Sequence, residues 1–308
     1  MSNFFRFNRL CIPIFCVAMA SASATVPDKI EPVPKIITAK IRLDEQSMII
    51  VPVRLNGSGP YDFMLDTGCS KTMVDGELAR ELRLPHVGEK TVAGVFASAQ
   101  MLVVQVNSLS VEGATVLGGE LFDTDRPATV TSKVRGVLGE DFLRNFDLLI
   151  DNDRQVIRLE SALGSMAETA GGEHLPLQLT STRHGNPIHN RLIVSGRIEE
   201  FGDTAISLLL DSGTNQLILF KDDLGPGQSQ TGPFSAGSFG QWITSSSPAR
   251  RIRTLTLGSR SVTDLTVIAI ARRADVDTDG LIPTSLFHSI FISHFGRFVI
   301  LNPSFPKA

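Results

Sequence analysis

The sequence predicts a mainly β protein built of two homologous, barrel-like lobes related by a pseudo-two-fold axis. The first observation is an internal repeat, in which FMLDTGCS returns 145 residues later (211 − 66) as LLLDSGTN. The second is local: runs such as SMIIVPVRL and LTVIAIA are rich in β-branched residues and are bounded by glycine, proline or asparagine. Long strands with few helical patterns, in a repeat of this length, favour two closed β lobes.

Four further segments recur in the same order. AGVFA (93–97) pairs with AGSFG (236–240), LSVEG (109–113) with LTLGS (255–259), GVLGEDFL (136–143) with GLIPTSLF (280–287), and DRQVIRLE (153–160) with GRFVILNP (296–303). A single Asp-Ser/Thr-Gly triplet is common, but five ordered matches at nearly one offset are not a composition accident. They divide the chain into an N-terminal lobe (36–160), a small, polar and glycine-rich surface linker (161–172) and a C-terminal lobe (173–308).

Only two short helices are predicted in the first lobe. DGELARELRL (75–84) has Asp75 as a candidate cap and places Leu78 and Leu82 on one face. A second short helix is predicted within EDFLRNF (140–146).

The first 24 residues have the pattern of an export signal. Arg6 and Arg9 precede the apolar run LCIPIFCVAMA (10–20), and Ala22-Ser23-Ala24 fits a cleavage site. The run is shorter than the roughly 20 residues that a membrane-spanning helix needs. We therefore expect a periplasmic or secreted protein, cleaved near Ala24, with a proline-rich leader (25–35) and no stable membrane insertion.

The charges and cysteines exclude several classes of function. The 29 basic and 32 acidic residues form no block of like charge, which argues against a nucleic-acid partner. Signal cleavage leaves Cys69 as the only cysteine, so no internal disulfide is expected. The histidines at positions 174, 184 and 189 lack the companion residues of a zinc site, and no phosphate-binding glycine loop is present. We expect neither a metal nor an organic cofactor.

The repeated triplets make Asp66 and Asp211 the candidate catalytic residues. Each follows a run of large apolar residues, where an ionised carboxylate is costly unless another group shares its charge. A pseudo-two-fold axis would bring the two together, and neighbouring carboxylates share one proton and titrate as a pair. The flanking residues are expected to support them: Gly68 and Gly213 by allowing tight turns, Thr67 and Ser212 by hydrogen bonds to the opposite turn.

These motifs resemble the aspartic peptidases of the pepsin and retropepsin clan, most closely bacterial exported retropepsin-like proteins with two fused lobes. The resemblance covers both lobes and includes a hydrophobic-hydrophobic-Gly strand that passes behind each turn. VLG (137–139) fits this strand in the first lobe, and LIP (281–283) occupies its place in the second, with Pro283 where glycine is usual. Because proline lacks a backbone N–H, the second crossing is the weaker match. The resemblance implies the acid-protease fold.

The resemblance also implies flap hairpins above the site. Pepsin-like enzymes carry a tyrosine there, but the only tyrosine of this chain is Tyr61, just before the first turn. The repeated Ala-Gly-x-Phe segments are therefore the flap candidates, through Gly94, Phe96, Gly237 and Phe239. A flap on each lobe is more similar to the retropepsin arrangement.

The predicted function is that of an aspartic endopeptidase that uses a water held between Asp66 and Asp211 and forms no covalent intermediate. Its partner would be a polypeptide substrate in extended conformation. Because both half-sites lie in one chain, a monomer should suffice. The alternative is a catalytically silent peptide-binding protein on the same fold; a purely structural envelope protein would give the two carboxylates no purpose.

One asymmetry separates the two turns. The residue after the glycine is Cys69 in the first lobe and Thr214 in the second, and a thiol is a weaker hydrogen-bond donor than a hydroxyl. If these side chains donate to the nearby carboxylates, Asp66 is the residue that more often holds the shared proton. The same hypothesis predicts that Cys69→Ser shifts the pH optimum to more acidic values. If Cys69 instead packs behind the turn, the substitution changes nothing.

Overall fold

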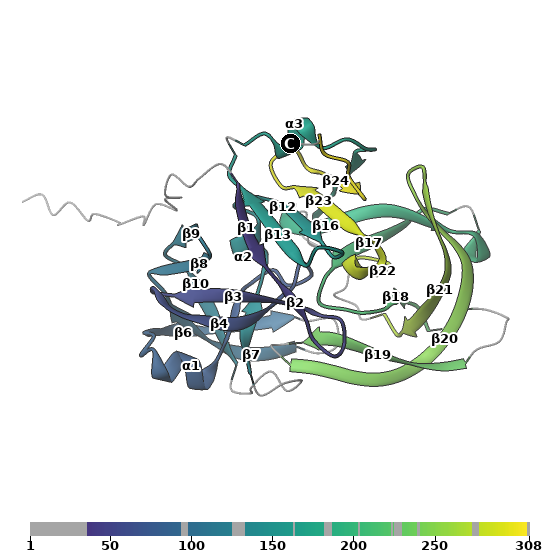
Figure 1. The fold of residues 1–308 in the computed structure, drawn as a ribbon. Helices are drawn as coiled ribbons and strands as arrows, with labels where there is room; N and C mark the ends of the chain where they lie inside the picture. The colour runs from purple at the N-terminus through teal and green to yellow at the C-terminus, as the bar shows by residue number, and fades with distance from the viewer. Residues whose placement is uncertain are drawn as a thin grey trace, which may run out of the picture.

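The computed structural model confirms the predicted fold class: the chain is mainly β, with strands in three sheets around two lobes (Figure 1). The residues that the structure describes are 36–93, 98–124, 133–162, 164–181, 187–202, 204–222, 224, 230–238, 241–272 and 277–306. The predicted export signal and leader lie outside them. In the described part of the chain, no helix combines the length and apolar character needed to cross a membrane.

A six-stranded sheet connects the two lobes. Its order is β1 (Ile37–Lys40), β13 (Val156–Glu160), β12 (Asp147–Asp151), β23 (Ser289–Ser293), β24 (Phe298–Leu301) and β14 (Leu175–Pro176). At its centre β12 and β23 run antiparallel, with Leu149 opposite Phe291. These two strands occupy the same place in their lobes, so their antiparallel contact has the self-complementary form that a two-fold axis produces.

The first lobe is formed by a ten-stranded sheet. Its strands are β2 (Arg42–Leu43), β3 (Ile49–Leu55), β4 (Ser58–Leu65), β5 (Met73–Asp75), β6 (His86–Ala93), β7 (Ser98–Gln105), β8 (Ser108–Val111), β9 (Ala114–Leu117), β10 (Glu120–Thr124) and β11 (Val134–Leu138).

The second lobe is formed by an eight-stranded sheet. Its strands are β15 (Gln178–Ser181), β16 (Pro187–Ile198), β17 (Ile206–Asp211), β18 (Leu217–Phe220), β19 (Gln230–Ser238), β20 (Gln241–Leu257), β21 (Arg260–Ile270) and β22 (Gly280–Pro283). Two 3₁₀ turns, η1 (Glu199–Phe201) and η2 (Thr284–Leu286), accompany them.

The strands around the two Asp-containing turns pair in the same pattern in both lobes. In the first lobe β11 lies parallel to β4 and antiparallel to β5, and β10 lies parallel to β5. In the second lobe β22 lies parallel to β17 and antiparallel to β18, and β21 lies parallel to β18. This shared topology places each turn at the end of a central strand whose flanking strands are buried.

The strand that passes behind the second turn forms despite Pro283. The reason is that the donor and the acceptor of one hydrogen bond of the first lobe are both replaced in the second. In the first lobe the Gly139 N–H donates to the Thr72 hydroxyl at 3.1 Å. The strand registers align Thr72 with Leu217 and Gly139 with Pro283. The second lobe therefore lacks both the donor and the acceptor at this place, so neither is left unsatisfied.

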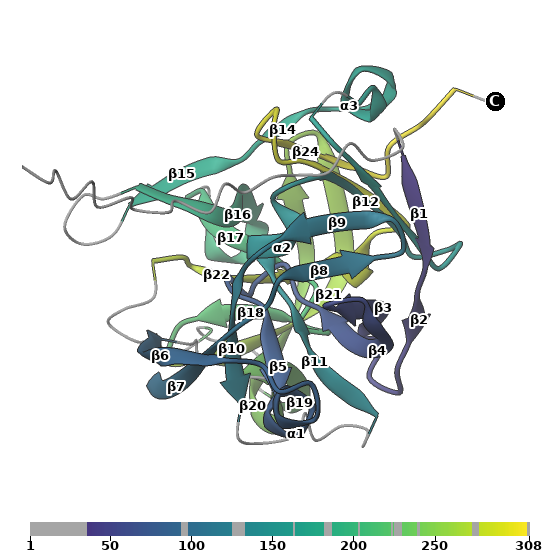
Figure 2. The same cartoon turned by 90° about the vertical axis from the view of Figure 1, so that its left-hand side faces the viewer.

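The two helices of the first lobe form where the sequence predicts them, and a third short helix lies in the predicted linker. Helix α1 (Gly76–Glu81) is capped by Asp75, whose carboxylate accepts the Glu77 N–H at 2.7 Å, and α2 (Glu140–Leu143) begins within the predicted segment. The segment 161–172, predicted as a linker, contains the short helix α3 (Met166–Thr169). Met166 is buried against the outer face of the six-stranded sheet, where Figure 2 shows α3 beside β24 and β14.

Candidate active site

The two predicted catalytic aspartates lie at the ends of equivalent strands. Asp66 follows β4 and Asp211 is the last residue of β17. Both are 8% exposed, so each carboxylate is largely removed from water. The Asp66 N–H donates to Leu138 O on the crossing strand β11 at 3.0 Å, which fixes the first turn against the sheet.

The residues after the aspartates connect the two turns by four reciprocal hydrogen bonds. The Thr67 N–H donates to the Ser212 hydroxyl and the Ser212 N–H donates to the Thr67 hydroxyl, each at 3.0 Å. The Thr67 hydroxyl then donates to Leu210 O at 2.9 Å, and the Ser212 hydroxyl to Leu65 O at 2.8 Å. Each hydrogen bond donated by the first turn therefore has an equivalent donated by the second turn. The predicted contacts between the turns are therefore present.

The glycines place each turn against the opposite carboxylate. Gly68 N–H donates to Asp66 at 2.9 Å, and Gly213 N–H donates to Asp211 at 2.7 Å. A Cβ atom on Gly68 would lie 2.6 Å from Asp211 Cγ, and one on Gly213 would lie 2.5 Å from Asp66 Cγ. Only glycine fits at either position, because a side chain would occupy the space of the opposite carboxyl group.

Burial and mutual interaction shift the pKa values of the two carboxyl groups. Burial raises the pKa of Asp66 well above its usual value, and the nearby charge of Asp211 raises it further. Burial also raises the pKa of Asp211, to about 6, while the Gly213 N–H and the hydrogen bond from Asp66 hold it down. Burial and the charge of Asp211 thus favour the protonated form of Asp66, while the Gly213 N–H and the hydrogen bond from Asp66 favour the charged form of Asp211.

The reason proposed for that asymmetry is wrong in the case of Cys69. Its backbone N–H donates to Asp66 at 3.0 Å, but its thiol donates to Lys71 O at 3.0 Å. The side chain packs against an apolar cluster that includes Met64 and Met73. Burial, followed by the charge of Asp66, raises the pKa of the thiol well above its usual value, so Cys69 is not an activated nucleophile. The Thr214 hydroxyl donates to Gln216 O at 3.3 Å.

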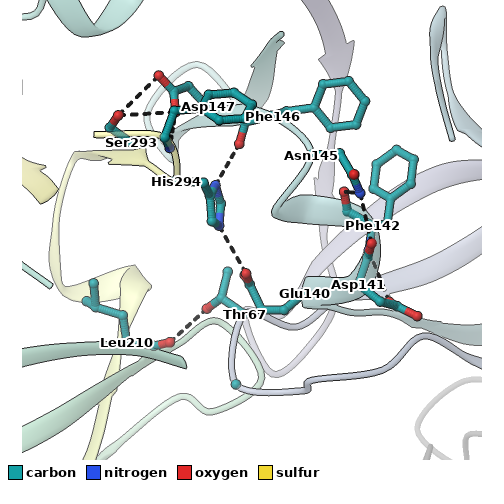
Figure 3. Close-up of polar contacts among 12 residues, drawn as sticks. Thr67, Glu140, Asp141, Phe142, Asn145, Phe146, Asp147, Leu210, Ser293 and His294 are labelled. Atoms are coloured by element: carbon teal, nitrogen blue, oxygen red, sulfur yellow. Dashed lines mark hydrogen bonds and ion pairs between the residues drawn. The ribbon is translucent and has the colours of Figure 1, made fainter. Parts of the chain in front are cut away.

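A buried ion pair behind the first turn was not predicted. His294 Nε2 lies 3.0 Å from a carboxylate oxygen of Glu140, and His294 Nδ1 donates to Phe146 O at 2.6 Å (Figure 3). Their side chains are 5% and 1% exposed. The Glu140 N–H donates to Cys69 O at 2.8 Å, so this pair connects the turn to the end of β23. An acidic residue within a helix and a distant histidine carry no local signal of such a contact.

Two hairpins lead to the segments that the sequence names as flap candidates. Strands β6 and β7 pair up to Ala93 and Ser98, and β19 and β20 pair up to Ser238 and Gln241. Figures 1 and 2 place β7 and β19 on the side of the molecule opposite the six-stranded sheet. Gly237 lies on β19 opposite Trp242. The other candidates, Gly94, Phe96 and Phe239, lie outside the described residues.

The histidines that the sequence discounted as metal ligands are only partly described. His174 stacks on Phe298, with ring centroids 3.9 Å apart and the rings 3° from parallel. His184 and the side chain of His189 lie outside the described part of the chain.

Comparisons with known proteins agree with the motifs. Residues 51–142 match the sequence model of the family described as aspartyl protease. No curated protein matches. Among solved structures, a retropepsin-like aspartic protease from Rickettsia conorii is 17% identical with a TM-score of 0.32, over 41% of this chain and 91% of that chain. The matched segment runs from β3 to α2 and contains the first Asp-Thr-Gly turn, so it confirms the resemblance of this chain to the aspartic peptidases.

Proposed function

We propose that this protein is an aspartic endopeptidase that hydrolyses peptide bonds with a water activated by Asp66 and Asp211. The observation that carries the proposal is the pair of buried carboxyl groups on two turns that are connected by reciprocal hydrogen bonds. The family match over residues 51–142 supports protease activity in general.

In the proposed reaction the two aspartates exchange protons with the substrate. Ionised Asp211 takes a proton from the water, whose oxygen attacks the carbonyl carbon, while Asp66 gives its proton to the carbonyl oxygen. The tetrahedral product then breaks its C–N bond. Asp211 returns its proton to the leaving nitrogen, and Asp66 recovers a proton from one hydroxyl as the carboxylic acid forms. Atoms and charges balance without a covalent enzyme intermediate.

The arrangement of the hairpins favours an extended polypeptide as the substrate. The β6–β7 and β19–β20 hairpins lie on the side opposite the six-stranded sheet, and strand edges bind extended peptides through backbone hydrogen bonds. We further propose that the protein acts as a monomer after export to the periplasm or the outside of the cell, with its signal removed near Ala24.

A digestion experiment tests the proposal against the alternative of a silent peptide-binding protein. The wild type and Asp66→Asn are incubated with a mixture of denatured proteins over a pH series, and new termini are detected by mass spectrometry. Cleavage by the wild type alone supports the peptidase. Saturable binding of a hydroxyl-bearing, non-cleavable peptide analogue without cleavage at any pH would support the binding protein instead.

A further inference from the structure

A single arginine lies across from one aspartate of the pair. Strand β16 runs antiparallel to β17 with Ile193 opposite Leu209. The paired residues end at Ile193 and Leu209, and extending their register by two residues would bring Arg191 opposite Asp211. In the first lobe Ile50 on β3 lies opposite Met64 on β4, and this pair corresponds to Ile193 and Leu209 of the second lobe.

The residue that corresponds to Arg191 in the first lobe is Met48. Extending the register of β3 and β4 in the same way, by two residues beyond Ile50 and Met64, would bring Met48 opposite Asp66. Met48 is 1% exposed and belongs to an apolar cluster. The two aspartates therefore have different neighbours at this place: a thioether beside Asp66 and a guanidinium beside Asp211.

Arg191 shares a face of the sheet with Asp211. Side chains of a strand alternate between faces, so Arg191 points to the same side as Ile193, and Asp211 to the same side as Leu209. Ile193 and Leu209 pack together in one apolar cluster. Directly opposite residues on one face have Cβ atoms about 4.5–5.5 Å apart, which lets their side chains interact.

The guanidinium is held by one acidic residue and is partly desolvated. Arg191 Nη2 lies 3.3 Å from an oxygen of Asp277, and the two side chains are 27% and 24% exposed. Among the residues that the structure describes, the buried Nε atom of Arg191 has no hydrogen-bond partner. The charge of Arg191 is therefore shared between Asp277 on one side and Asp211 on the other.

We propose that Arg191 is a positioning residue that keeps Asp211 ionised as the base and so leaves the shared proton on Asp66. This inference rests on the proposed peptidase reaction and goes beyond it, since it assigns the two roles to particular members of the pair. A cation opposite a carboxylate stabilises its charged form, and Met48 offers no such charge to Asp66.

The electrostatics around Asp211 support this assignment. Among the described residues, the charged and titratable groups near Asp211 are Asp66 and the Cys69 thiol from the opposite turn and Arg191 from β16. Burial raises the pKa of Asp211, while the Gly213 N–H, the hydrogen bond from Asp66 and, to a smaller extent, the Arg191 charge lower it. Arg191 is faced in turn by Asp211 and by Asp277, which precedes β22. Removing Asp277 should free more of the guanidinium charge for Asp211, so substitutions at the two positions should act in opposite directions.

The experiment compares the pH dependence of kcat/KM for cleavage of fluorescein-labelled casein. Arg191→Met, which copies the first lobe, should move the acidic limb to higher pH by about one unit. Arg191→Lys should restore most of the wild-type profile, and Asp277→Asn should move the limb to lower pH. Arg251→Met is the matched control, because Arg251 pairs with Asp264 on the exposed surface of the same lobe. Superimposable profiles of the wild type, Arg191→Met and Asp277→Asn would overturn the proposal.

A second measurement separates this proposal from the peptidase activity itself. The carboxyl ¹³C resonances of aspartate-labelled protein are titrated in the wild type, Arg191→Lys and Asp277→Asn, and Asp211→Asn identifies the Asp211 signal. A lower midpoint for Asp211 in Asp277→Asn, with a near-wild-type midpoint in Arg191→Lys, supports the assignment even if no substrate is cleaved. An Asp211 midpoint that does not change in Asp277→Asn would overturn it.

Discussion

Thr67 and Ser212 donate to each other across the boundary between the two lobes, each backbone N–H reaching the other hydroxyl at 3.0 Å. Each hydroxyl also donates to a backbone carbonyl of the opposite lobe. The two turns are thus one hydrogen-bonded unit. The positions of Asp66 and Asp211 relative to each other depend on both lobes at once.

Replacing either aspartate by asparagine should abolish cleavage and preserve folding. Asparagine has nearly the same shape but cannot transfer the proton, so Asp66→Asn and Asp211→Asn should each lower kcat by at least about 10³-fold. The melting temperature should stay the same or rise, because one buried ionisable group is removed. Assays with labelled casein test the loss of kcat, and thermal melts test the melting temperature. Near-wild-type turnover in either variant would contradict the shared-proton mechanism.

The turn glycines should tolerate no side chain. Gly68→Ala and Gly213→Ala each introduce a Cβ within 2.6 Å or less of the opposite carboxyl carbon. We expect a loss of activity of about 100-fold or more from a displacement of this kind. Gly113→Ala is the matched control, because its Cβ would meet only the end of the Ile37 side chain, at 3.3 Å. Equal activities of the three variants would show that the turns can widen without cost.

The activity should fall on the acidic side of pH 6. The reaction requires ionised Asp211, whose pKa is raised by burial to about 6. As the pH drops below this value the base becomes protonated, so kcat/KM should decrease about tenfold per unit. Burial and the nearby charge of Asp211 raise the pKa of Asp66 well above its usual value, which favours its protonated form. A profile with full activity at pH 3 would contradict these directions.

Cys69→Ser should leave the pH profile unchanged. The thiol donates to Lys71 O and packs against apolar side chains, so a hydroxyl at this position would have the same carbonyl partner. Profiles of kcat/KM for the wild type and Cys69→Ser should therefore superimpose. An acidic shift in the variant would instead indicate that residue 69 donates to Asp66.

The ion pair of Glu140 and His294 should make stability depend on pH. Burial alone would lower the pKa of His294, but the charge of Glu140 and the hydrogen bonds to Glu140 and Phe146 O raise it above its usual value of 6.5. The stabilisation is therefore complete below pH 6.5, where the unfolded histidine is also protonated, and is lost as the pH rises through the higher folded pKa.

This dependence can be measured by urea denaturation. His294→Gln should cost about 3–5 kcal/mol at pH 6, because it leaves Glu140 buried without its partner, and the difference from the wild type should shrink at higher pH. His288→Gln is the control, since His288 faces Asp153 at 3.1 Å with 77% of its side chain exposed. A cost for His294→Gln that does not vary with pH would show that the histidine acts only through packing.

The sequence by itself was sufficient for the fold class and for the central pair. Asp66 and Asp211 stand out because each ends an apolar strand and precedes a hydroxyl residue and a glycine, and because these local patterns recur at one offset. Strand periodicity and turn residues are properties of short segments, so they can be read without knowing what packs against them. The cap Asp75 was predictable for the same reason.

Only the tertiary structure showed which groups surround each member of the pair. Arg191 comes near Asp211 through strand register, and His294 meets Glu140 over a separation of 154 residues. The absence of a donor at Pro283 is harmless because Leu217, which lies beside it only in the folded sheet, lacks the acceptor that Thr72 provides in the first lobe. The energy of a buried charge or an unpaired N–H depends on the groups that folding brings within a few ångströms, and these come from segments distant in sequence.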